Sequence, residues 1–315
     1  MEQLRAVFED AVARHRALDL EAAIAGYRAI LRVAPQLDFV VDNLCQALLG
    51  AGEYKEGFGL YDVRFRRRRN SVYRPDLPFP EWRGEPLAGR SIIVFPEQGF
   101  GDQIMFARFV RPLQEAGAEV TLAAAPELVR TFAPLGVKVI AYTEPFGRHD
   151  FWCLIGSLPG RLGVTRLAGT PYLKGGGGES GIGVAWRGRP THANDANRSL
   201  PVELAERLLA LPGAVNLDVG ETGARDFEET AERIRSLACV VSVDTAIAHL
   251  AGAMGVPTLC LLPRIGIDWR WGAESESTPW YDSMTLARAG DDGWEPLLRD
   301  VVSGGWRRAL DRRAS

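Results

Sequence analysis

The sequence of 315 residues has few of the side chains that build metal sites and disulfide scaffolds. It contains four cysteines and four histidines, and no two cysteines stand at metal-ligand spacing. Each cysteine lies beside apolar residues, a pattern that predicts reduced, buried thiols in a cytoplasmic protein. These residues are Cys45, Cys153, Cys239 and Cys260. We therefore expect neither a metal site nor a disulfide framework.

Long apolar runs and an excess of one charge are also missing. No stretch approaches the ~18 uninterrupted apolar residues of a membrane span, and the amino terminus is charged where a signal peptide would be apolar. The formal net charge of −3 gives no electrostatic reason to expect nucleic acid as a partner. We expect a soluble, cytoplasmic chain whose length suits two or three domains.

The first seventy residues repeat with a period of 34. Aligning this segment with itself pairs Tyr27 with Tyr61 and Ala13 with Ala47, and it places small residues where helices would cross. This period is typical of tetratricopeptide repeats, so residues 1–69 are predicted to be two such repeats, with a generic helical bundle as the alternative. Two repeats are fewer than the ~3 that usually fold alone. We therefore expect them to pack on the rest of the chain or on a second copy.

After a proline-rich connector at residues 70–90, short apolar runs alternate with helical patterns. The expected strands are 91–95, 119–123, 137–141, 151–155, 181–186, 214–219, 238–243 and 258–262. This alternation predicts an α/β fold with parallel sheets that helices cover on both faces. Four glycines at 175–178 are expected to form a flexible joint. They separate an amino-terminal Rossmann-like domain, 91–174, from a carboxyl-terminal one, 179–315.

The loop after the first strand contains Glu97, Gln98, Gly99 and Gly101, followed by Asp102. Ligands of open parallel sheets bind at the carboxyl ends of the strands, so this loop is a candidate site. Its two glycines do not complete a dinucleotide-binding fingerprint, because the third small residue is missing. Asp102 stands at a predicted helix start, where an aspartate can cap the helix, act as a general base, or do both.

The loop after the fifth strand contains Trp186 and Arg187, and Arg198 follows before the next helix. Guanidinium groups are suited to phosphate oxygens. The alternative is solvated surface charge, which explains Arg189 better than Arg187 or Arg198. We therefore expect Trp186, Arg187 and Arg198 on the wall of a phosphate site.

The seventh strand runs into Asp244, Thr245 and Ala246, and a helix rich in small residues follows. The first amides of such a helix can bind a diphosphate. His249 is one helical turn from Thr245 and shares its face. It is either a packed core histidine or a member of the site.

Four blocks of sequence carry a resemblance: EQGFGDQIMFARF, VAWRGRPTHANDANRSLP, SVDTAIAHLAGAMGVPT and DWRW with TPWY. They resemble the carboxyl region of bacterial tetratricopeptide-repeat glycosyltransferase-like proteins and, more distantly, the ADP-heptose:lipopolysaccharide heptosyltransferases. The resemblance covers the repeats and residues 87–300. It implies a GT-B fold without metal or cofactor, with the nucleotide sugar on the carboxyl half and the acceptor at the loop that contains Glu97 and Gly101.

The resemblance also implies that Asp102 is the base and that residues 244–246 form the phosphate-binding turn. The heptosyltransferase lysine that contacts the donor has no clear counterpart, and Arg187 or Arg198 is the candidate substitute. The resulting hypothesis is an inverting, metal-independent glycosyltransferase whose repeats recruit a protein or glycan acceptor. The alternatives are a non-catalytic interaction protein with a degenerate GT-B body, and a sugar-nucleotide epimerase or hydrolase.

Overall fold

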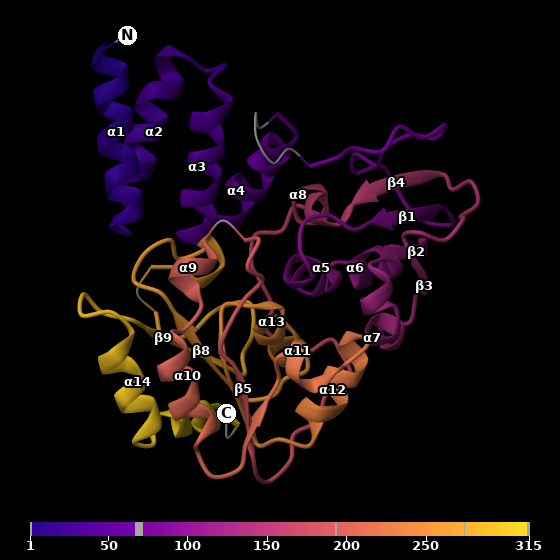
Figure 1. Cartoon of the computed structure of the whole chain (residues 1–315). Coiled ribbons are helices and arrows are strands. Elements are labelled where there is room, and N and C mark those ends of the chain that lie inside the picture. The colour runs from indigo at the N-terminus through magenta and orange to yellow at the C-terminus, as the bar shows by residue number, and fades with distance from the viewer. Residues whose placement is uncertain (1, 67–71, 193, 274, 314–315) are drawn as a thin grey trace.

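A helical segment precedes two parallel sheets in the computed structural model of the chain (Figure 1). The structure describes residues 2–66, 72–192, 194–273 and 275–313. None of the helices in these ranges combines the length and the apolar character that crossing a bilayer requires. All four cysteines are buried thiols.

Two helical hairpins form the amino-terminal segment. Their elements are α1 (Glu2–Arg16), α2 (Leu20–Val33), α3 (Asp38–Gly50), α4 (Tyr54–Leu60) and the 3₁₀ helix η1 (Tyr61–Arg66). A Cβ at Gly26 would lie only 2.8 Å from the Cβ of Ala11, so small residues allow α1 and α2 to approach closely. The tetratricopeptide assignment stays a prediction. Its predicted border with the connector, at residues 69 and 70, lies outside the described residues.

The second hairpin packs on the rest of the chain through aromatic rings. Phe58 lies edge-on to Trp269 and Trp280, with ring centroids 6.2 and 6.5 Å apart. Tyr61 packs against Trp269 at 6.1 Å and against Phe106 at 6.1 Å. Buried aromatic contacts of this size stabilise an interface strongly. They give the short helical segment the partner surface that two hairpins need.

The amino-terminal sheet has the strand order β3-β2-β1-β4, and all of its pairs are parallel. Its strands are β1 (Ser91–Phe95), β2 (Glu119–Ala124), β3 (Lys138–Ala141) and β4 (Phe151–Leu154). Its helices are α5 (Phe100–Ala107), α6 (Val110–Glu115), α7 (Val129–Phe132) and α8 (Leu158–Arg161). From β1 the chain adds β2 and then β3 on one side of the sheet. The last strand, β4, then pairs with the other side of β1. The switch point of this sheet therefore lies beside β1.

The carboxyl-terminal sheet is also parallel, in the order β6-β5-β7-β8-β9. Its strands are β5 (Ile182–Ala185), β6 (Ala214–Asn216), β7 (Cys239–Val243), β8 (Thr258–Leu262) and β9 (Met284–Arg288). Its helices are α9 (Asp195–Arg198), α10 (Val202–Leu209), α11 (Val219–Thr222), α12 (Phe227–Arg235), α13 (Ala246–Ala253), α14 (Trp294–Val302), η5 (Trp269–Trp271) and η6 (Gly305–Arg313). The switch point lies between β5 and β7. The sequence did not predict β9, because its threonine and arginine interrupt the apolar run.

The glycine run at 175–178, predicted to be a flexible joint, passes close to the backbone of the carboxyl-terminal half. A Cβ at Gly175 would lie 2.8 Å from the carbonyl oxygen of Met254, and a Cβ at Gly178 would overlap the carbonyl of Ser236. The Gly178 N–H also donates to the Leu237 carbonyl at 2.8 Å. Glycine leaves room for these close approaches. Residues 175–177 are exposed, and the flexible joint stays a prediction.

Candidate functional site

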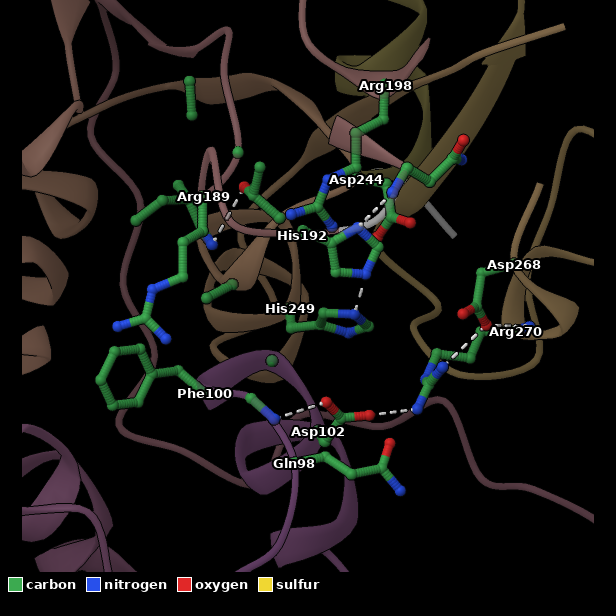
Figure 2. Close-up of a pocket in the computed structure, with 18 of the residues that line it drawn as sticks. Gln98, Phe100, Asp102, Arg189, His192, Arg198, Asp244, His249, Asp268 and Arg270 are labelled. Carbon is green, nitrogen blue, oxygen red and sulfur yellow. Dashed lines mark hydrogen bonds and ion pairs between the residues drawn. The ribbon is translucent and has the colours of Figure 1, made fainter. Parts of the chain in front are cut away.

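A cavity of about 1140 Å³ lies where the switch points of the two sheets face each other. Its walls include the loops after β1, β5 and β7, the segment that follows β6 (217–230), the segment from 266 to 272, and the turn between α1 and α2. Figure 2 shows the charged side chains that project into it from both halves of the chain. They include Asp102, Arg189, Arg198, Asp244, Asp268 and Arg270.

Asp102 lies in the first turn of α5 and faces the cavity. Its Oδ2 accepts the N–H of Gly99, the N-cap residue, at 2.9 Å. Its Oδ1 forms an ion pair with the guanidinium of Arg270, and the side chain stays 20% exposed. The carboxylate therefore caps the helix and also reaches the cavity, so the two roles expected of it are compatible in this geometry.

Arg270 joins the two halves of the site, and the sequence analysis did not single it out. Its Nη1 donates to Asp268 Oδ1 at 2.7 Å, and its guanidinium lies 4.5 Å from the ring centroid of Trp269. Burial alone would lower the pKa of Arg270, but the carboxylates of Asp268 and Asp102 raise it well above its usual value. Arg270 is therefore a fixed positive charge on the cavity wall. No local pattern could reveal its contact with Asp102, which lies 168 residues earlier.

The turn from β7 into α13 opens on the cavity through Asp244, Thr245 and Ala246. Thr245 is the N-cap, and its hydroxyl accepts the N–H of Ile247 at 3.3 Å. Burial and, to a smaller extent, the negative charge of Asp268 raise the pKa of Asp244 to about 6. This carboxyl group can therefore exchange a proton near neutral pH.

His249 lies between Asp244 and the start of α5 (Figure 2). Its Nδ1 is 2.9 Å from the hydroxyl of Tyr281, its ring stacks on Trp271 with centroids 5.2 Å apart, and its Nε2 is 4.0 Å from Asp244 Oδ1. Burial, followed by the charge of Arg270, lowers the pKa of His249 well below its usual value. His249 is thus a packed, neutral core histidine whose edge lines the cavity.

The neutral state of His249 predicts a pH dependence of stability. Below about pH 6.5 the unfolded chain protonates this histidine and the folded chain does not, so the free energy of unfolding falls as the pH drops. Replacing His249 by asparagine removes this contribution. Melting temperatures measured from pH 5 to 7 should fall less steeply with decreasing pH in the variant than in the unmodified protein. Equal slopes would mean that His249 titrates normally in the fold.

Gly101 lies at a close contact between α5 and α13. A Cβ there would lie 2.8 Å from His249 Cδ2 and 3.6 Å from the Cα of Ala246. The predicted glycine of this loop is therefore required by contact between the two halves, and its φ angle is not positive. Gly99, which precedes α5, also lines the cavity.

Replacing Gly101 by alanine should lower the free energy of unfolding by about 1–3 kcal/mol, because the added methyl overpacks this contact. Gly59 provides a matched control, since it is also helical and a Cβ there would meet nothing within 4 Å. Gly59→Ala should raise stability by up to about 1 kcal/mol through helix propensity. Urea unfolding of both variants measures the difference. Changes of the same sign would contradict the contact.

The three arginines of the loop after β5 differ in how their charges are balanced. Arg187 forms an ion pair with Asp218 and lies 4.8 Å from the ring centroid of Trp186. Arg198 Nε is 3.4 Å from Asp195 Oδ1. Among the described residues, no acidic side chain lies within 4.0 Å of the Arg189 guanidinium. The charge at Arg189 is therefore less compensated than that at Arg187.

The predicted loop residues do not all face the cavity. Glu97 is buried and points away from it into an ion pair with Arg64 of η1. Gln98 lines the cavity, has a φ of 60°, and donates from Nε2 to the hydroxyl of Tyr61 at 3.2 Å. Trp186 lines the cavity and packs partly into the core of the carboxyl-terminal sheet. Glu97 is the one predicted site residue whose side chain the structure turns elsewhere.

Metal-ligand clusters were not expected. In the part of the chain that the structure describes, no three His, Cys, Asp or Glu side chains converge as ligands of one ion. The titratable groups that line the cavity include arginines, carboxylates and the histidines His15, His192 and His249.

Comparison with known proteins places one match directly on this site. Residues 194–263 match the family described as glycosyltransferase family 9 (heptosyltransferase). The matched segment contains Arg198, the 244–246 turn and His249, while Asp102 lies outside it. This match supports a glycosyltransferase.

A curated relative and two solved structures are also similar to the chain. Protein FlbA of Caulobacter vibrioides is 26% identical over 90% of this chain, which spans only 58% of the length of FlbA. The iron-containing dodecameric glycosyltransferase TibC of enterotoxigenic E. coli is 14% identical, with a TM-score of 0.44 over 56% of this chain and 59% of TibC. A family 9 glycosyltransferase of Veillonella parvula is 10% identical, with a TM-score of 0.41 over 71% of this chain and 94% of its own.

Proposed function

We propose that the chain is an inverting, metal-independent glycosyltransferase that moves a sugar from a nucleotide-sugar donor to an acceptor hydroxyl. One observation carries the proposal: loops from the switch points of both sheets line a single cavity. The loop after β1 contributes Asp102, and the loop after β7 contributes residues 244–246. The family match over 194–263 supports the same chemistry. The proposed architecture is of the GT-B type, with two Rossmann-like domains around the donor.

In the proposed reaction, Asp102 accepts the proton of the acceptor hydroxyl as its oxygen attacks the anomeric carbon. The bond from that carbon to the phosphate oxygen breaks on the opposite face, so the configuration inverts. The leaving nucleotide keeps the electron pair and carries the new negative charge. No cofactor takes part, and the nucleotide sugar is a substrate.

The leaving phosphate is proposed to lie against the first amides of α13, near Arg198 and Arg189. Backbone N–H groups and the helix dipole favour an anion at this position. Asp244 lies at the same turn, and its pKa of about 6 would rise further beside an anion. Uptake of a proton by Asp244 would then relieve its repulsion of the phosphate.

The helical segment is proposed to recruit the acceptor, which is a protein or a glycan. The cavity supports this arrangement, because it extends from Asp102 to His15, Leu18 and Leu20 at the turn between α1 and α2. An acceptor held by the hairpins would therefore lie beside the entrance to the site. The repeats can present a concave surface of the kind that binds peptides.

Thermal unfolding in the presence of UDP, GDP, ADP and CMP sugars tests the donor site. We expect one nucleotide class to raise stability, by about 2.7 kcal/mol at a ligand concentration of 100 Kd. Ala246→Glu should abolish the shift, because it places a carboxylate at the phosphate turn. Ala210→Glu, at an exposed position outside the cavity, makes the same charge change and should retain it.

Other outcomes of this screen would favour other functions. No shift with any of the four nucleotide classes would contradict the proposal and favour a non-catalytic interaction protein. A shift accompanied by release of free sugar or of an isomer, with no acceptor needed, would indicate a hydrolase or an epimerase.

A further inference from the structure

We infer that Arg64 of the helical segment is a positioning residue for the loop that carries Asp102. The inference rests on the proposed function and deepens it, because it makes the helical segment a part of the catalytic site itself. It starts from a buried ion pair that the proposed reaction does not use. The pair joins Arg64 in η1 to Glu97 after β1.

Every N–H group of the Arg64 guanidinium has a partner. Nε lies 3.1 Å from both carboxylate oxygens of Glu97, and Nη2 donates to Glu97 Oε2 at 2.9 Å and to Ser157 Oγ at 2.8 Å. Nη1 donates to the Tyr61 carbonyl at 3.1 Å and to Asp62 Oδ1 at 2.8 Å. The side chains of Arg64 and Glu97 are 0% and 1% exposed. A forked, fully bonded guanidinium fixes the direction of the carboxylate that it holds.

The backbone of Gly156 confines the Glu97 carboxylate on one side. Gly156 lies against it, and a Cβ at that residue would overlap Glu97 Oε1. Burial raises the pKa of Glu97, while the charge of Arg64 lowers it. Moving the carboxylate away from Arg64 would leave both charges buried and unpaired, which is costly.

The fixed carboxylate holds the backbone that leads to Asp102. Gln98, the next residue, has a φ of 60°, a conformation that costs a non-glycine residue about 1 kcal/mol or more and persists only where its surroundings enforce it. Tyr61 of η1 contacts the same residue through the hydrogen bond from Gln98 Nε2. Gly99 follows, and its N–H binds the Asp102 carboxylate. A continuous set of contacts therefore runs from η1 to the base.

Stability alone does not explain the pair. Buried ion pairs are on average no more stabilising than well-packed neutral side chains of the same volume. What the pair adds is a defined orientation for residues 97–99. Without it, we expect Gln98 to relax to a negative φ and the Gly99 N–H to leave Asp102.

The double variant Arg64→Met/Glu97→Gln tests this role, since it removes both charges and leaves none unpaired. We expect a melting temperature close to that of the unmodified protein and a donor KM within about twofold of it, with kcat lower by about 10- to 100-fold, because small displacements of a reacting group have effects of this size. Hydrogen exchange should become faster in residues 95–106 and stay unchanged elsewhere in the sheets. Arg64→Lys keeps the charge but lacks the fork, and it should show the same changes to a smaller degree.

A matched control replaces another ion pair of low exposure. Arg235 and Glu228 are 2.7 Å apart in the carboxyl-terminal half, away from the cavity. Arg235→Met/Glu228→Gln should leave kcat and the exchange of residues 95–106 unchanged.

The exchange measurement separates failure of this inference from failure of the proposed function. If the unmodified protein transfers no sugar, the proposed function fails, and exchange in residues 95–106 still decides the positioning role. Unchanged exchange or unchanged kcat in the double variant would overturn the inference. If the double variant does not fold, Arg64→Lys replaces it in both measurements. Hydrogen exchange and kcat equal to those of the unmodified protein would then overturn the inference.

Discussion

Replacing Asp102 by asparagine should lower the kcat of glycosyl transfer by about 10²- to 10⁴-fold, the contribution typical of a general base. The amide has nearly the shape of the carboxylate, so its oxygen can still accept the Gly99 N–H that Asp102 Oδ2 accepts now. The amide cannot take up the acceptor proton. Nucleotide binding should persist, because the proposed donor contacts belong to the carboxyl-terminal half.

Steady-state transfer assays and thermal shift with the nucleotide identified by the screen measure the two effects separately. Asp291→Asn is the matched control, since Asp291 is 86% exposed and pairs only with Arg264 in the described structure. That variant should keep full activity. If Asp102→Asn retained full transfer activity, Asp102 would be eliminated as the base and would be left with its capping role.

Replacing Arg270 by methionine should lower the free energy of unfolding by about 3–5 kcal/mol, the usual cost of breaking a buried ion pair from one side. The Arg270 side chain is only 9% exposed and pairs with both Asp102 and Asp268. Methionine fills part of the volume of the arginine side chain. It leaves the carboxylates of Asp102 and Asp268 on the cavity wall without their positively charged partner. It also removes a buried charged contact between the amino-terminal and carboxyl-terminal halves.

Arg264→Met provides the comparison, because the Arg264 side chain is 53% exposed and its partner Asp291 is largely in solvent. Exposed ion pairs contribute about 0–1 kcal/mol, so this variant should lose at most that amount. Denaturant unfolding of both variants measures the difference. Similar losses for the two would show that Arg270 is not the buried link between the halves that its contacts indicate.

Features that depend on local sequence patterns were predicted correctly, and features that depend on contacts between distant residues were not. The strand at 91–95 and the helix start at Asp102 were predicted because apolar periodicity and capping are local. The burial and pairing of Glu97 were not predicted, for the opposite reason. Nothing near residue 97 indicates that its partner is Arg64, 33 positions earlier.

The glycine run at 175–178 is a second feature whose contacts the sequence does not reveal. Four successive glycines have the same composition whether the chain is loose or is closely packed against Met254 and Ser236. Similarly, the sequence does not show which arginine of the loop after β5 has an acidic partner. Only the position of Asp218 distinguishes Arg187, whose charge is paired, from Arg189.

The sequence by itself determined the helical hairpins, the two parallel sheets and the three loops that meet at the cavity. These features depend on hydrophobic period and on the rule that parallel strands present their carboxyl ends on one side. Tertiary structure alone decided which charges are paired. Arg270 forms an ion pair with Asp102, Arg64 with Glu97, and Arg187 with Asp218. Such pairings join residues far apart in the chain, and the strength of an ion pair depends on distance and burial, which spacing along a sequence does not encode.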